Sequence, residues 1–117
     1  MKELDNFGKV ISEDLRDAAL NRYLDIESGN CASSAGKELS ASLEGFTSEQ
    51  KSIIRRLLSD AVDSGVHDFL FSLESSDDIK VLSSGRNVQE LSDGLNGEIF
   101  TEDGWFEKYS QHPESGI

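Results

Sequence analysis

Cysteine and proline are almost missing from this chain of 117 residues, which contains one of each. Because the single cysteine, Cys31, has no partner for an internal disulfide, the sequence is not that of a disulfide-stapled secreted scaffold. A reducing compartment fits this cysteine usage. The one proline lies in the final segment, QHPESGI, which we expect to be frayed.

Long apolar runs are missing as well. No stretch approaches the roughly 18 consecutive apolar residues that a membrane-spanning helix needs. The first ten residues, MKELDNFGKV, carry acids and no apolar run, unlike a secretory signal or a membrane anchor. We therefore expect a soluble, cytoplasmic protein.

Positive charge is in short supply: 11 Lys and Arg oppose 23 Asp and Glu, which gives a net charge of −12 at pH 7. Nucleic acids and anionic membranes attract basic surfaces, so both are disfavoured as partners. A basic protein partner is favoured by the sign of the charge. The alternative is that the acidity only keeps the protein dissolved.

The length and the apolar pattern predict one folded domain, residues 1–117, of the mainly α class. We expect three to four helices packed on a long central helix, with a minor β-hairpin. The expected elements are a helix over 4–27, a short helix over 34–44, the central helix over 48–74, a hairpin near 79–91 and a short helix over 102–109.

Helical periodicity is the basis for the two longest elements. In the first, apolar residues three or four apart are expected to face the core: Leu4, Phe7, Ile11, Leu15, Ala18, Ala19, Tyr23 and Ile26. In the central helix the expected buried face is Ile53, Ile54, Leu57, Leu58, Ala61, Val62, Val66, Phe69, Leu70 and Leu73. Thr47 and Gln50 have the spacing of a capping box, and Gly65 falls on the apolar stripe, where it could let another helix approach.

The segments after the central helix give weaker signals. IKVL and NVQEL alternate weakly on either side of SSGR, which predicts a hairpin that turns at Gly85. Thr101 followed by Glu102 and Asp103 resembles a helix start, and Leu39, Leu43 and Phe46 give the short second helix an apolar side.

A second stripe on the central helix is the first candidate site, a partner patch. Its members follow one another at intervals of three or four: Arg56, Asp60, Asp63, His67 and Phe71. Phe71 is either covered by the C-terminal segment with Trp105 and Phe106 or exposed as an anchor for a partner. We expect the covered arrangement, with His67 at the edge of the core.

The glycine-rich acidic segment ELSDGLNGEIFTEDGW is the second candidate, a loop site. It comprises Asp93, Glu98, Glu102, Asp103 and Trp105. The spacing fails the EF-hand pattern, because the third position from Asp93 is Leu95 and the fifth is Gly97. Convergent carboxylates could still bind a cation, but turns that carry Leu95, Ile99, Phe100 and Trp105 inward are the simpler explanation.

Other chemistry lacks the necessary spacing. No phosphate-binding glycine loop is present, and Cys31, His67 and His112 are isolated, unlike zinc ligands. No base is placed beside Cys31 or a serine for nucleophilic catalysis. The sequence thus points to no catalytic residue, no metal and no cofactor.

The segment LSDGLNGEIFTEDGWFEKYS resembles the tail of small bacterial proteins of uncharacterised function, in which SDG-x-x-GE precedes GW and an aromatic end. The resemblance covers the last fifth to quarter of the chain and implies no catalytic residues.

Charge and the lack of catalytic spacing favour a non-enzymatic domain that binds a basic protein, as toxin-immunity or antitoxin proteins do. The alternatives are a small carboxylate- or metal-dependent enzyme and an accessory or self-associating domain without a ligand.

Overall fold

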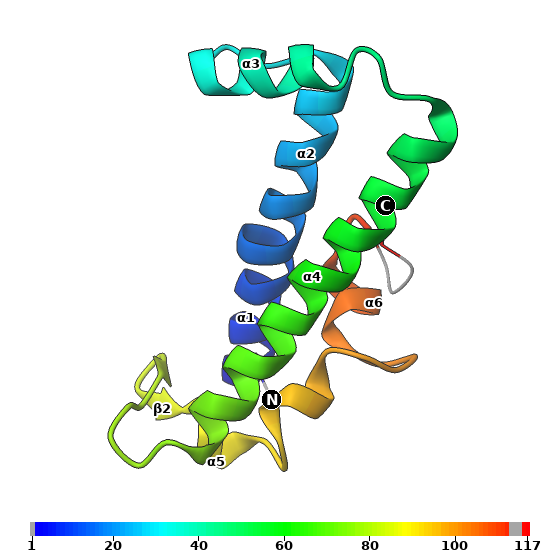
Figure 1. The fold of residues 1–117 in the computed structure, drawn as a ribbon. Helices are drawn as coiled ribbons and strands as arrows, with labels where there is room; N and C mark the ends of the chain where they lie inside the picture. The colour runs from blue at the N-terminus through cyan, green and yellow to red at the C-terminus, as the bar shows by residue number, and fades with distance from the viewer. Residues whose placement is uncertain (1, 113–115) are drawn as a thin grey trace.

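The computed structural model describes residues 2–112 and 116–117, and in them the chain is mainly helical with one small two-stranded hairpin. This confirms the predicted fold class. Figure 1 shows two long rods that cross: an N-terminal rod and α4. The rod is formed by α1 (Lys2–Val10), the π-helix η1 (Ile11–Asp17) and α2 (Ala18–Ser28), and α4 spans Ser48–Ser75, with α3 (Ser34–Ser42) between them.

Local capping explains where the helices begin and end. Gly29, with φ of 77°, ends α2 in the left-handed conformation. Ser33 caps α3 by accepting a hydrogen bond from the Gly36 amide. At the start of α4 the Gln50 amide donates to Thr47 Oγ1 at 3.1 Å, and the Thr47 amide donates to Gln50 Oε1 at 2.8 Å. The predicted capping box is therefore confirmed.

The hairpin is shorter than the prediction over 79–91. β1 (Leu82–Ser83) pairs antiparallel with β2 (Arg86–Asn87), and Ser84 and Gly85 turn between them with φ of 49° and 82°. Two positive φ values are the signature of the tight turn that matches strand twist. The residues predicted to extend the second strand instead form the helical turn α5 (Val88–Leu91), because the Asn87 side chain caps it.

The C-terminal helix begins later than predicted. It is α6 (Trp105–Tyr109), preceded by the 3-10 turn η2 (Leu95–Glu98), and its N-cap is Gly104 rather than Thr101. Thr101 instead accepts a hydrogen bond from the Gly104 amide in a turn and has φ of 125°. The acids Glu102 and Asp103 thus lie in the turn before the helix.

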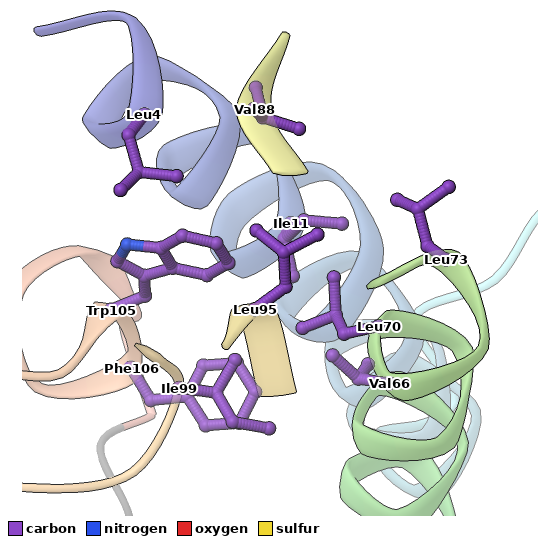
Figure 2. Packing of buried hydrophobic residues seen from close by; sticks show 10 residues of the cluster. All are labelled: Leu4, Ile11, Val66, Leu70, Leu73, Val88, Leu95, Ile99, Trp105 and Phe106. Atoms are coloured by element: carbon purple, nitrogen blue, oxygen red, sulfur yellow. The ribbon is translucent and has the colours of Figure 1, made fainter. Parts of the chain in front are cut away.

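The hydrophobic core joins the lower part of both rods to the C-terminal third of the chain. Figure 2 shows α4 residues facing α1 and η1, with Leu95, Ile99, Trp105 and Phe106 inserted between them. The cluster consists of Leu4, Ile11, Val66, Leu70, Leu73, Val88, Leu95, Ile99, Trp105 and Phe106. Ile99, Leu95 and Trp105 are therefore carried inward by the glycine-rich segment, as the turn explanation predicts.

Gly8 is required by the packing of Trp105. A Cβ on Gly8 would lie 2.4 Å from atoms of the indole ring, so the tryptophan rests directly on the α1 backbone. Phe7 meets the same ring edge to face, with ring centroids 5.8 Å apart. The glycine in the first helix is therefore a packing requirement.

The π-helix changes which side of the N-terminal rod is buried. A π-helix has more residues per turn than an α-helix, so successive side chains are separated by a smaller angle about the axis. The buried row therefore follows every fourth residue: Leu4, Gly8, Ser12, Arg16 and Leu20. Leu15, Ala18 and Ala19, predicted to face the core with a period of 3.6, are exposed. That part of the predicted stripe is wrong.

The predicted buried face of α4 is also only partly correct. Val66, Leu70 and Leu73 are in the core, whereas Ile53, Leu57 and Phe69 are exposed. Gly65 lies on an exposed side, and within the described part of the chain no atom of a neighbouring element comes within 4 Å of the position of a Cβ. The upper part of α4 extends beyond the core, where Ile54 and Leu58 are half-buried while Ile53 and Leu57 stay exposed.

The molecule is elongated, with principal extents of 49 × 29 × 22 Å. Its radius of gyration is 16.4 Å, whereas a compact domain of this length has about 13 Å. Figure 1 shows the cause: α3 lies across the end of α2, at the same end as the first turns of α4 and far from the core. This end carries the predicted second helix, which is confirmed but ends at Ser42.

Candidate functional site

An acidic pocket lies on the side of α4 that carries the predicted partner patch. Its volume is about 330 Å³, and its lining residues are Asp60, Asp63, Ser64, His67, Asp68 and Phe100. All but Phe100 project from three successive turns of α4. The structure thus brings three of the five patch residues together and adds Ser64, Asp68 and Phe100, which the patch did not include.

The other two patch residues are Arg56 and Phe71. Both are exposed, and neither lines the pocket. The exposed fraction of Phe71 is 58%, so the expectation that Trp105 and Phe106 cover it is wrong. Those two aromatic residues pack on the N-terminal rod instead, because Gly8 makes room there for the indole. Phe71 is an exposed aromatic residue one turn beyond His67.

His67 is half-exposed and has a polar contact at each ring nitrogen. Its Nδ1 lies 3.1 Å from Asp68 Oδ1, and its Nε2 lies 3.3 Å from the side-chain nitrogen Nδ2 of Asn96. Asn96 belongs to η2, so this contact ties the pocket wall to the glycine-rich segment. The two contacts hold the ring in the pocket lining, where the side chain is 40% exposed. The expectation of a core-edge histidine went with a covered Phe71, which the structure does not have.

The floor of the pocket is fixed by a buried arginine. Arg16 is fully buried, and its Nε donates to Asp63 Oδ1 at 2.6 Å while Nη2 reaches Oδ2 at 3.3 Å. Its guanidinium also lies over the Phe106 ring, 4.1 Å from the centroid. This fork geometry orients the Asp63 carboxylate and offsets part of its charge, which leaves Asp60 and Asp68 as the more available acids of the pocket.

Arg16 also holds the C-terminal segment, through Nη1. This nitrogen donates to Ser110 Oγ at 2.9 Å and to the carbonyl of His112. Asp17 accepts from the Ser110 hydroxyl and, at 2.8 Å, from the Gln111 amide. Ile117 is attached to α4 as well, since its amide donates to Ser59 Oγ at 3.1 Å. Residues 110–112, 116 and 117 are thus held rather than frayed, while 113–115 lie outside the described residues.

Ser110, His112 and Asp17 come close together but not as a catalytic triad. The His112 ring nitrogen Nε2 lies 2.7 Å from Asn21 Oδ1, whereas the contact of His112 with Ser110 runs through its backbone amide at 2.9 Å. A triad needs the imidazole itself on the nucleophilic hydroxyl. The Ser110 hydroxyl donates to Asp17 and the His112 ring contacts Asn21, so the cluster fastens the chain end without the triad geometry.

A second ion pair links the rods above the pocket. Arg55 Nε donates to Glu27 Oε2 at 2.9 Å, and its Nη2 pairs with Oε1. The hydrogen bonds from Arg55 lower the pKa of Glu27 below its ordinary value. Nearby, burial raises the pKa of Tyr23 to about 12, and the Glu27 carboxylate acts in the same direction. These groups fasten α4 to the last turn of α2.

The predicted loop site is spread over several environments. Asp93, Glu102 and Asp103 are exposed, Glu98 is half-buried, and Trp105 is 1% exposed in the core. Among the described residues, which include all four acids, no group of three or more His, Cys, Asp or Glu is placed to hold a metal ion. Trp105 therefore has a packing role in Figure 2.

The sequence pattern did not predict that Arg16 and Asp17, two charged residues of η1, are buried. Arg16 belongs to an i, i+4 row that runs from Leu4 through Gly8 and Ser12 to Leu20 and contains no acid. With 3.6 residues per turn this row drifts away from the apolar stripe, so that Arg16 and Leu20 fall on its far side. The row is buried because η1 is a π-helix, and the periodicity of the sequence does not predict a π-helix.

Comparison with protein-family models, with curated proteins and with solved structures found no match to this chain. The resemblance of the C-terminal segment to small bacterial proteins stays a prediction. No helix in residues 2–112 or 116–117 combines the length and apolar character needed to cross a membrane.

Proposed function

We propose that this chain is an acidic protein-binding domain and that the α4 pocket receives an arginine or lysine side chain of a basic partner. The observation that carries the proposal is the pairing of three carboxylates with an aromatic ring around one hollow: Asp60, Asp63, Asp68 and Phe100. Carboxylates attract the charged head of such a side chain, and aromatic rings attract its planar or aliphatic part.

The charge of the rest of the chain supports this assignment. A net charge of −12 draws a basic protein toward the domain over long range, which raises the association rate. Lasting contact needs apolar anchors, and Phe71, exposed one turn beyond the pocket, is suited to that role. An inhibitor that neutralises a basic enzyme, as immunity proteins do with basic nucleases, is the type of activity that we infer.

A hexa-arginine peptide labelled with a fluorophore tests the proposal by anisotropy. The double variant Asp60→Asn/Asp68→Asn removes two charges from the pocket, and Glu13→Gln/Asp14→Asn removes two charges from exposed positions on η1. We expect the pocket variant to weaken binding about tenfold, or about 1.4 kcal/mol, and the control to weaken it about twofold or less. Equal losses of affinity in the two variants would mean that binding depends only on net charge, and the pocket proposal would then be wrong.

A further inference from the structure

The end of the molecule far from the core has almost no buried residue. We call residues 34–57 the tip; it comprises α3, the connecting loop and the first turns of α4. All 24 of its residues are described, and Gly36 is the only buried one. Four large apolar side chains of the tip are exposed: Leu39 by 51%, Phe46 by 42%, Ile53 by 55% and Leu57 by 64%. Apolar exposure gathered in this way is typical of an interface.

The tip also differs from the rest of the chain in charge. It holds 4 of the 11 cations and 3 of the 23 acids, a net charge of +1. These are Lys37, Lys51, Arg55 and Arg56 against Glu38, Glu44 and Glu49. The remaining 7 cations and 20 acids give the rest of the chain a net charge of −13. The apolar end is therefore the part of the surface where two copies do not repel each other.

We infer that the tip is the interface of a symmetric dimer of this chain. A basic partner is drawn to the acidic remainder and away from the tip, whereas a second copy brings the same apolar residues and the same small charge. Two-fold symmetry is the commonest arrangement of self-associating proteins.

The helices of the tip have capped ends but little packing within the chain. α3 has 9 residues, too few for a stable isolated helix. It lies against α2 and the loop that follows α2 at Gly36, where a Cβ would be 3.3 Å from Arg22 Nη1 and 3.0 Å from Cys31 Cβ. Leu39, on the other hand, remains exposed. A second copy would cover such residues.

Sedimentation equilibrium from about 10 μM to about 1 mM tests the dimer, a range that detects dissociation energies down to about 4 kcal/mol. The mass should rise with concentration toward twice 12.9 kDa. Leu57→Glu should keep the mass at one copy, because it places an acid in the apolar contact. Phe69→Glu, which is 52% exposed on the same helix but outside the tip, should still dimerise.

Circular dichroism of both variants checks that their helix content is unchanged, as expected for exposed positions. A wild-type protein that stays at 12.9 kDa at the highest concentration overturns the inference by itself. So does a dimer that Phe69→Glu breaks and Leu57→Glu does not. The pocket variant Asp60→Asn/Asp68→Asn lies outside the tip and should dimerise like the wild type, which separates this test from that of the proposed function.

Discussion

Arg16 Nε donates to Asp63 Oδ1 at 2.6 Å across 47 residues of sequence, and this pair joins the N-terminal rod to α4 at the floor of the acidic pocket. The same guanidinium bonds Ser110 in the C-terminal segment. One fully buried side chain thus connects three parts of the chain. The Arg16 side chain is fully buried and the Asp63 side chain is 14% exposed, so the pair is costly to break from one side, because the remaining charge has little water around it.

Removing the guanidinium should destabilise the whole fold. Arg16→Ala leaves the acids that face it without their partner and opens a cavity beside Phe106. We expect a loss of about 3 to 5 kcal/mol in the free energy of unfolding, measured with urea. Arg56→Ala, on an exposed position of α4, should change it by less than about 0.5 kcal/mol. Similar effects of the two substitutions would contradict the buried pair.

Two glycines should respond in opposite directions to the same substitution. Gly8→Ala places a Cβ 2.4 Å from the Trp105 ring and should cost about 1 to 3 kcal/mol. Gly65→Ala adds a Cβ in open space in the middle of α4 and should stabilise by about 0.5 to 1 kcal/mol. Thermal unfolding of both variants checks this, and destabilisation by Gly65→Ala would mean that α4 has a close neighbour at that position.

The Glu27–Arg55 pair predicts a dependence of stability on pH. Because the pKa of Glu27 is lower in the folded chain than its ordinary 4.5, its stabilisation is present above pH 4.5 and is lost as the pH falls through the folded pKa. Glu27→Gln should therefore be less stable than the wild type at pH 7, and the difference should shrink in acid. Urea titrations at several pH values measure it.

The control for that titration is Glu38→Gln, at an exposed position on α3. It should alter the free energy of unfolding by less than about 0.5 kcal/mol at pH 7. A Glu27→Gln profile parallel to that of the wild type at every pH would show that the pair contributes nothing through titration.

Substitutions at Phe71 and Phe106 should affect different properties, peptide binding in the first case and stability in the second. Phe71→Ala removes an exposed ring, so stability should stay within about 0.5 kcal/mol while the hexa-arginine peptide binds less tightly. Phe106→Ala empties a fully buried position and should cost about 3 to 5 kcal/mol in stability. Urea unfolding and anisotropy are measured on the same samples. A large loss of stability in Phe71→Ala would indicate that Phe71 is covered by other residues, as the sequence predicted.

The elements predicted best from sequence were those with local signals. The capping box at Thr47 and Gln50 fixed the start of α4, and Gly29 fixed the end of α2. What escaped prediction depends on tertiary structure: a π-helix moved Arg16 inward and Leu15 outward, and a tryptophan resting on Gly8 left Phe71 exposed. Periodicity could not indicate that an apolar face at Ile53 and Leu57 extends beyond the core. The acidic stripe was visible, but Phe100 joins it only through folding.

The most direct test of the proposed function is where a basic peptide binds. In a two-dimensional NMR spectrum of the ¹⁵N-labelled protein, hexa-arginine should shift the amides of Asp60, Ser64, His67, Asp68 and Phe100 first, and these shifts should vanish in Asp60→Asn/Asp68→Asn. Shifts spread evenly over the acids of η1, α5 and the 102–103 turn, or unchanged in the variant, would contradict the account.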